Sequence, residues 1–356
     1  MEELRHGGAV GRQTKGSDEH PGNRSWQGVF PYALQTMSSI GLVLGGGGIT
    51  GAAFQLAALM SLELACDWRA NDADVVIGTS GGAYVASLVR CGKLDLDSLV
   101  RHDEDPDSVA DRIRRHVFTK NPSLELGRWL RGGVLPGLRR PGMSLLMGSP
   151  ARYTPHGLAA WVEHQVGPAA HDWPTDPTVI TAYDVESRQR VGFGTENAPR
   201  VSLAHAVAAS SAIPVLFHPH QVEGRAYVDG GVASGTHLDL VLTSAEELDL
   251  IIVIAPMAAT ERRRRAFPHE LVLDRLGRRA LEEEMRVVTD AWPDTDILVL
   301  RPPMSVLDQM RPNPMAADRA VPTFVTTLRA MRRELATPEV WGLLCDHFGR
   351  PQALAV

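Results

Sequence analysis

The chain has 356 residues, of which 44% are hydrophobic and 22% charged, a composition that is typical of a globular protein and not of a fibrous or low-complexity one. Its formal net charge of −6 argues against bulk attraction to nucleic acid, so no nucleic-acid partner is expected. The three cysteines, Cys66, Cys91 and Cys345, are far apart and form no C-x-x-C pair, so neither a disulfide framework nor a zinc site is indicated.

Residues 1–37 are rich in glycine and polar residues and lack the apolar core of a signal peptide, so we expect a disordered segment there. No stretch reaches about 18 uninterrupted apolar residues, and no transmembrane helix is expected. The sequence therefore predicts a cytoplasmic protein whose membrane contact, if any, is peripheral. Residues 38–350 are expected to form a single α/β domain, with a helical insertion at about 94–168 and a C-terminal helical region at about 261–350.

Short apolar runs alternate with longer helical patterns from residue 40 onward. This alternation predicts an α/β fold with a mostly parallel central sheet and helices on both faces. The expected strands are residues 40–44, 74–77, 178–184, 190–193, 226–228, 248–255 and 296–301, and the expected helices are residues 50–64, 82–90, 202–210, 268–291 and 322–336. The helix at 268–291 carries the acidic run Glu282-Glu283-Glu284 and is expected to be a solvated cover.

Four consecutive glycines follow the first strand and lead into the first helix. Glycines let main-chain N–H groups approach and converge on an anion, and two anions fit: a nucleotide phosphate or the oxyanion of an acyl transfer. The pattern Gly46-x-Gly48-x-x-Gly51 formally matches a dinucleotide loop, with Asp72 and Asp74 about 20 residues further on. A Walker A loop is not indicated, because no Lys-Ser/Thr pair follows the last glycine.

The next motif, Gly78-Thr79-Ser80-Gly81-Gly82, places a serine in G-x-S-x-G where an apolar strand gives way to a helix. A tight turn would hold the serine in a strained conformation, and side chains at its neighbours would clash with the adjoining strand and helix. The start of the helix adds free amides and a positive dipole end, which favour an oxyanion. Ser80 is therefore the candidate nucleophile.

The insertion at 94–168 contains a short basic and apolar element, with Arg139 and Arg140 ahead of Met143, Leu145 and Leu146. Such an element can touch a lipid interface or can pack on the core as an amphipathic segment, and the sequence leaves both interpretations open.

Further along, Asp229 stands at the end of a short strand, directly before Gly230 and Gly231. A serine hydroxyl needs a partner that accepts its proton, and a carboxylate within hydrogen-bond reach can serve if desolvation raises its pKa toward the working pH. Asp229 is the candidate base.

Taken together, Gly46-Gly47-Gly48-Ile49-Thr50-Gly51, then Gly78-Thr79-Ser80-Gly81-Gly82, then Asp229-Gly230-Gly231 resemble the three motifs of the patatin-like phospholipase family, in the family's order. Residues 179–184 and 206–214 also resemble that family, and the resemblance spans about 40–255. It implies a three-layer α/β sandwich and an enzyme that hydrolyses lipid esters, of the phospholipase A or lysophospholipase type. A lipid or acyl ester is then the expected partner, and no metal or organic cofactor is expected.

The resemblance also implies roles for particular residues. The family uses a Ser-Asp dyad, which would make Ser80 the nucleophile and Asp229 the base. The amides of Gly46, Gly47 and Gly48 would form the oxyanion hole, with Gly47 and Gly48 as the main donors. The remaining motif glycines, which would support these turns, are Gly51, Gly78, Gly81, Gly82, Gly230 and Gly231.

One position departs from the family pattern: Thr50 stands where the family usually carries Arg or Lys, which puts a preference for strongly anionic lipids in doubt. Three alternatives stay open. An α/β-hydrolase triad would use a histidine such as His237 or His347, a nucleotide-binding oxidoreductase would use the glycine loop, and a non-enzymatic module would keep only the fold. The oligomeric state is not indicated.

Overall fold

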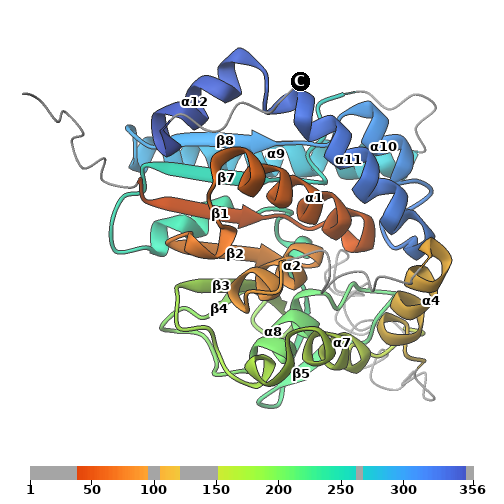
Figure 1. Cartoon of the computed structure of the whole chain (residues 1–356). Helices are drawn as coiled ribbons and strands as arrows, with labels where there is room; N and C mark the ends of the chain where they lie inside the picture. Colours follow the sequence, from red (N-terminus) through yellow and green to blue (C-terminus); the bar gives the residue numbers. More distant parts are fainter. Residues whose placement is uncertain (1–37, 95–104, 121–150, 262–267, 350–356) are drawn as a thin grey trace, which may run out of the picture. The chain divides into compact units, whose positions relative to one another are not determined.

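A mostly parallel eight-stranded sheet forms the centre of the molecule in the computed structural model, which describes residues 38–94, 105–120, 151–261 and 268–349 (Figure 1). The strand order is β5-β6-β3-β2-β1-β7-β8, and β4 pairs with β3 off this path. The strands are β1 (Ile40–Leu44), β2 (Val75–Thr79), β3 (Thr178–Asp184), β4 (Gln189–Phe193), β5 (His220–Val222), β6 (Arg225–Asp229), β7 (Leu250–Ile254) and β8 (Asp296–Leu300). The described residues belong to one unit, Met37–Val356.

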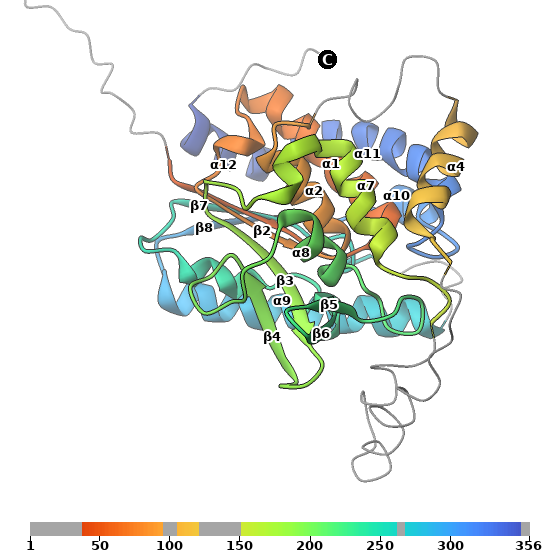
Figure 2. The same ribbon diagram turned by 90° about the horizontal axis from the view of Figure 1, so that it is seen from below.

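Helices cover both faces of the sheet, which confirms the predicted α/β fold (Figure 2). The α-helices are α1 (Gly48–Cys66), α2 (Gly81–Arg90), α4 (Pro106–Val117), α7 (His156–Val166), α8 (Leu203–Ser210), α9 (Pro268–Ala291), α10 (Met304–Gln309), α11 (Ala320–Glu334) and α12 (Pro338–Phe348). Short 3₁₀ helices are η1 (Ala70–Asp72), η4 (Gly167–His171), η5 (Gly230–Val232), η6 (Leu238–Thr243) and η7 (Ala317–Arg319).

The alternation of side chains along each strand divides the core into two layers. In β1, Leu42 and Leu44 belong to the cluster that contains residues of α1, α2 and α8, whereas Val43 belongs to the cluster on the other face. That second cluster is closed by η6 and by Leu281 and Val288 of α9. A strand with both faces buried needs apolar residues at every position, which is why the central strands are continuous apolar runs.

Helix α1 is a core helix. Its 19 residues are long and apolar enough to cross a membrane by length and composition, but 72% of its most apolar window is buried inside the structure. Phe54, Leu59 and Leu62 are completely buried in the core against the sheet. The apolar character of α1 is therefore explained by its place between the sheet and the outer helices.

The pairing of β3 brings the carboxyl ends of β2 and β6 together. One edge of β3 pairs first with parallel β2, where Thr181 faces Thr79, and then with antiparallel β6, where Ala182 faces Asp229. Strand β4 pairs with β3 over the same stretch and occupies its opposite edge. The residue that follows β2 and the last residue of β6 must therefore meet.

Every strand and helix predicted by residue range is present, and no end is shifted by more than two residues. Strand β5 was not predicted. Helices α10 and α12 lie in the predicted C-terminal helical region, although no separate ranges were predicted for them, and α11 begins at Ala320 instead of residue 322. Helices α4 and α7 lie within the predicted insertion. The expectations for residues 1–37, for Arg139 and Arg140 and for the apolar run at 143–147 fall outside the described residues.

Candidate active site

Ser80 occupies the sharp turn between β2 and α2. Its backbone has φ 54° and ψ −120°, an unusual conformation for a residue with a side chain, and the residue is 5% exposed. Its N–H donates to the hydroxyl of Ser210, the last residue of α8, over 2.8 Å. The turn is thereby fixed from the side of α8, and strain of this kind is typical of a nucleophile held in place by a strand-to-helix turn.

The glycines around Ser80 are required by close backbone approach. A Cβ at Gly81 would lie 2.4 Å from the carbonyl oxygen of Gly48, and one at Gly82 would lie 2.1 Å from that of Leu44. Because both neighbours are backbone atoms, a side chain at either position would force the main chain to shift, which agrees with the steric reason expected for G-x-S-x-G. The contact of Gly81 with Gly48 also brings the first residues of α1 and α2 together beside Ser80, with the positive ends of both helix dipoles.

Asp229 lies within hydrogen-bond distance of Ser80. The hydroxyl of Ser80 donates to Oδ2 of Asp229 over 2.6 Å, and the N–H of Gly231 donates to Oδ1 over 2.7 Å. The Gly231 contact holds the carboxylate plane, which leaves Oδ2 directed at the hydroxyl. The structure thus brings together the two residues that the sequence singled out.

Burial raises the pKa of Asp229 to about 6, and the hydrogen bonds from Ser80 and Gly231 oppose part of that rise. Desolvation disfavours the charged form of a carboxyl group, so this pKa lies well above the ordinary value. A group with a pKa near the working pH can both accept and return a proton.

The glycine loop is held by three hydrogen bonds. The N–H of Gly45 donates to Ile254 over 2.9 Å, the buried amide of Gln55 donates to the carbonyl of Gly45 over 2.7 Å, and the N–H of Gly46 donates to the carbonyl of Gly235 over 2.7 Å. The N–H of Gly46 is therefore already used.

The next two amides of the loop are placed differently. Among the described residues, no acceptor is found for the N–H of Gly47 or of Gly48, which lie at the start of α1. These two groups are the ones that the loop can offer to an anion.

Thr50 is completely buried. Its N–H and its hydroxyl both donate to the carbonyl of Pro314, over 3.0 and 3.4 Å. A segment ahead of η7 thus packs on the glycine loop, and the sulfur of Met315 would lie 2.8 Å from a Cβ at Gly48. The uncharged residue at position 50 fits this contact with a neutral carbonyl.

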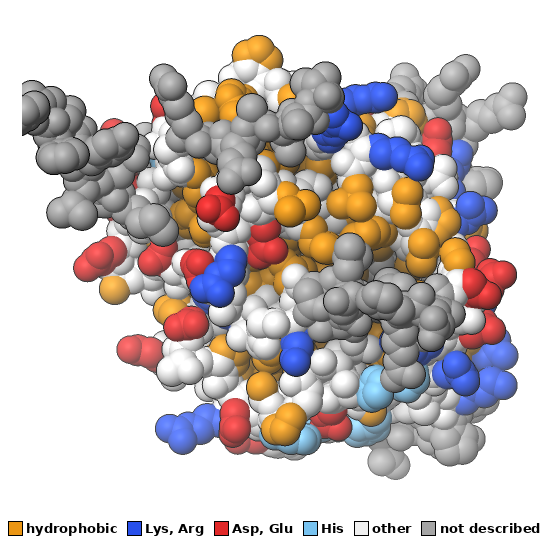
Figure 3. All heavy atoms as spheres, in the orientation of Figure 1, with side chains coloured by type: hydrophobic (Ala, Val, Ile, Leu, Met, Phe, Trp, Pro, Cys, Tyr) orange, Lys and Arg blue, Asp and Glu red, His pale blue; other side chains and the backbone are white. Residues whose placement is uncertain are grey.

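An apolar cavity of about 180 Å³ opens onto Ser80 and the start of α1. Figure 3 shows hydrophobic side chains gathered on the face that carries α1 and α11. The cavity is lined by α1, α4, α7 and α11, through residues that include Ile49, Ala52, Ala53, Leu56, Val109, Ile113, Val117, Leu158, Trp161, Val162, Val321 and Phe324. Most of these residues were not singled out from the sequence, because an amphipathic helix shows which of its faces is apolar but not which partner that face meets.

The histidines of the alternative triad lie elsewhere. His237 is completely buried, its Nδ1 lies 3.2 Å from the hydroxyl of Thr79, and burial lowers its pKa to about 3. His347 contacts Asp296 over 3.0 Å, at the amino end of β8. Neither histidine contacts Ser80 or the carboxylate of Asp229, so the triad finds no support in the geometry.

The acidic residues of the nucleotide interpretation are also at the wrong end of the sheet. Asp72 and Asp74 precede β2, whereas the glycine loop follows β1, which runs parallel to β2. Asp74 accepts the N–H of Ile40 over 2.6 Å. No group of three or more His, Cys, Asp or Glu side chains in the described part of the chain is arranged to hold a metal ion.

Comparison with known proteins gives one family match, to patatin-like phospholipases, over residues 42–242. Among solved structures, VipD from Legionella pneumophila is 14% identical with a TM-score of 0.34, over 83% of this chain and 67% of VipD. ExoU in the heterodimeric complex ExoU-SpcU from the type III secretion system of Pseudomonas aeruginosa is 18% identical with a TM-score of 0.26, over 85% of this chain and 67% of the other.

Proposed function

Because the chain belongs to the patatin-like phospholipase family, we propose that it is a serine acyl hydrolase of the phospholipase A or lysophospholipase type. The observation that carries this proposal is the 2.6 Å hydrogen bond from Ser80 to Asp229 at the edge of an apolar cavity. A buried hydroxyl that donates to a carboxylate of raised pKa is a pair that can generate a nucleophile without a third residue.

In the proposed reaction Asp229 accepts the proton of Ser80 while the serine oxygen attacks the ester carbonyl. The oxyanion that forms is stabilised by the N–H groups of Gly47 and Gly48. Collapse of the tetrahedral intermediate breaks the ester C–O bond, and the proton on Asp229 passes to the departing alcohol. Water then attacks the acyl-serine with Asp229 again as base, which releases the fatty acid and restores the serine. None of these steps needs a metal or an organic cofactor.

Hydrogen bonds from the N–H groups of Gly47 and Gly48 would lower the activation free energy substantially. Removal of one oxyanion donor typically costs on the order of 2.7–4 kcal/mol in the transition state. The N–H of Gly46 is not part of this proposal, since it donates to Gly235. The burial of the loop under the Pro314 segment keeps the remaining amides fixed, so no reorganisation is needed when charge develops.

The apolar lining of the cavity supports a long acyl chain as the group that enters it, with the scissile ester at Ser80. Such substrates reside in membranes or micelles, so the enzyme is proposed to contact lipid surfaces peripherally. Because Thr50 contacts Pro314 and brings no charge to the loop, we propose no selection for anionic headgroups at that position.

A fluorophosphonate probe tests the proposal directly, because it reacts only with an activated serine. The wild type should be labelled at Ser80 and should release fatty acid and lysolipid from mixed phospholipid vesicles, as measured by mass spectrometry of the products. Ser80→Ala should abolish both signals while its circular dichroism spectrum stays unchanged. Labelling of another residue, or equal lipid turnover by Ser80→Ala, would contradict the proposal.

A further inference from the structure

We propose that Glu284 is a positioning residue for this chemistry: it fixes the loop after Asp229 and, through the carbonyl of Gly235, holds the glycine loop in its working orientation. The inference rests on the proposed function, since it assigns a role within the same site. It concerns α9, which covers the sheet face opposite α1 and the cavity. Glu284 therefore acts through other residues and not on the substrate.

The sequence predicted a solvated acidic run here, and for Glu284 that expectation is wrong. Glu284 is 8% exposed, whereas its neighbour Glu283 is exposed and pairs with Arg286 over 2.6 Å. The difference follows from helical phase, because Glu284 shares the buried face of α9 with Leu281 and Val288.

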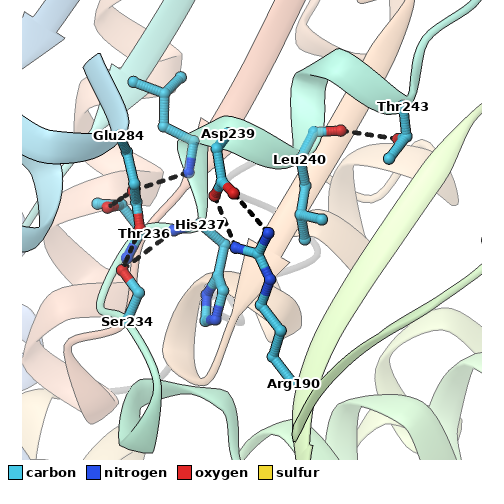
Figure 4. Close-up of polar contacts among 9 residues, drawn as sticks. Arg190, Ser234, Thr236, His237, Asp239, Leu240, Thr243 and Glu284 are labelled. Atoms are coloured by element: carbon cyan, nitrogen blue, oxygen red, sulfur yellow. Dashed lines mark hydrogen bonds and ion pairs between the residues drawn. The ribbon is translucent and has the colours of Figure 1, made fainter. Parts of the chain in front are cut away.

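The carboxylate of Glu284 binds three donors from one short loop (Figure 4). It accepts the hydroxyl of Ser234, the hydroxyl of Thr236 over 2.5 Å and the N–H of Leu238 over 2.9 Å. The hydroxyl of Ser234 in turn accepts the N–H groups of Thr236 and His237, over 3.2 and 3.4 Å. The N–H of Leu238 can only donate, and the two hydroxyls also donate to the carboxylate, so both of its oxygens act as acceptors here. Burial raises the pKa of Glu284, and these three hydrogen bonds oppose that rise.

Gly235 lies between two residues that Glu284 holds. Its carbonyl accepts the N–H of Gly46 over 2.7 Å. It also packs on the back of the glycine loop, since a Cβ at Gly45 would lie 3.1 Å from the Gly235 oxygen and 3.3 Å from the methyl of Thr236. A shift of Gly235 therefore moves Gly46 and the amide plane of Gly47 beside it.

The same loop begins at the candidate base. Asp229 is followed by η5 and then by Ser234, whose N–H donates to the carbonyl of Gly230 over 3.3 Å. A single buried carboxylate thus connects the strand end that carries the base with the loop that carries the oxyanion donors. Small misplacements of such groups lower the rate of the chemical step more than they weaken substrate binding.

The test compares Glu284→Gln with Glu283→Gln, its exposed neighbour on the same helix. Glutamine keeps the size of the side chain but replaces one accepting oxygen by an NH₂ group, so at least one of the three hydrogen bonds to Ser234, Thr236 and Leu238 must be lost or reversed. For a short-chain p-nitrophenyl ester, Glu284→Gln should lower kcat at least about tenfold with KM within about twofold, the pattern of a group that acts in the transition state. Glu283→Gln should match the wild type in both constants.

Hydrogen exchange gives a second readout that does not depend on the reaction. In Glu284→Gln, the peptide that contains Gly46 should exchange faster than in the wild type, with no change in peptides from β8. If the wild type hydrolyses no ester, the proposed function fails. The exchange rate at Gly46 still shows whether Glu284 controls the hydrogen bond between Gly46 and Gly235.

The proposal requires both effects. A folded Glu284→Gln variant with wild-type kcat, or one whose Gly46 peptide exchanges at the wild-type rate, overturns it. If Glu284→Gln does not fold, Thr236→Val removes a single donor and keeps the methyl packing on Gly45; a threefold or greater loss of kcat with faster Gly46 exchange supports the proposal, and unchanged values overturn it.

Discussion

The two ends of the sheet carry aspartates in opposite environments. Asp229 is the last residue of β6 and lies beside the carboxyl end of β2. It is buried, accepts a hydrogen bond from the hydroxyl of Ser80 and has a raised pKa. Asp249, at the amino end of β7, is exposed and accepts the N–H and hydroxyl of Ser39 over 2.7 and 2.9 Å; these hydrogen bonds lower its pKa. The same side chain is thus desolvated beside a serine hydroxyl at one end of the sheet and accepts hydrogen bonds from an exposed chain segment at the other.

Each end of the sheet also has a recess, and the two recesses differ in size and polarity. The amino end has the larger one, about 1020 Å³, lined by polar residues such as Asp74, Asp176 and Glu246. The cavity at Ser80 is only about 180 Å³ and mostly apolar. The proposed site therefore lies at the smaller of these two recesses. What distinguishes the site is a desolvated carboxylate that faces a strained serine.

The largest expected effect separates the two aspartates. Asp229→Asn should lower kcat/KM for an acyl ester by roughly three orders of magnitude or more, because a carboxamide cannot accept the proton of Ser80. Asp249→Asn should leave kcat/KM within about twofold of the wild type. Initial rates of p-nitrophenyl ester hydrolysis measure both. A wild-type rate in Asp229→Asn would rule out the dyad.

Thermal unfolding provides the control for that comparison. The pKa of Asp229 is raised from 3.8 to about 6, so its ionisation costs stability; the cost is absent below pH 3.8 and complete above about pH 6. At pH 7 the melting temperature of Asp229→Asn should therefore not fall below that of the wild type. A lower melting temperature would mean that the loss of activity reflects damage to the fold.

The pH dependence should show the same difference between the two residues. Only the ionised form of Asp229 accepts a proton, so kcat/KM should be flat above about pH 7 and fall about tenfold per unit below pH 6. Asp249 has a lowered pKa and stays ionised over this range, so Asp249→Asn should keep the same profile. Product analysis by mass spectrometry from pH 4.5 to pH 8 measures it; activity that stays level down to pH 5 would contradict a pKa near 6.

The sequence predicted the strands, helices and turns that depend on the pattern of neighbouring residues. The strand at Thr178–Asp184 was predicted with both ends correct because its buried sequence is rich in β-branched and aromatic residues, which favour a strand. Strand β5 was missed because its three residues, His220–Val222, are too few and too polar to show a period. The turn glycines and Ser80 were found because a sharp strand-to-helix turn restricts which residues fit.

The contacts between distant elements could not be predicted in the same way. The meeting of Ser80 with Asp229 depends on β2 and β6 sharing one edge of β3, which is a property of pairing and not of either motif alone. The N–H of Gly46 was proposed as a donor because nothing in the sequence reveals the carbonyl of Gly235 beside it. Glu284 had a usable signal in its spacing from Leu281 and Val288, but only a known helix phase turns that spacing into burial.

The smallest expected effect concerns two helical glycines, one packed against backbone next to Ser80 and one in open space in α12. A Cβ at Gly82 would lie 2.1 Å from the carbonyl oxygen of Leu44, whereas Gly342 in α12 has open space around it. Alanine gains up to about 1 kcal/mol of helix propensity over glycine at either position, and overpacking costs typically about 1–3 kcal/mol. At Gly82 the clash is with backbone and should dominate, so Gly82→Ala should lower the free energy of unfolding, while Gly342→Ala should raise it by about 1 kcal/mol. Urea unfolding measures both; a neutral Gly82→Ala would mean that the contact between α2 and β1 can relax, and the tight packing that we infer beneath Ser80 would be wrong.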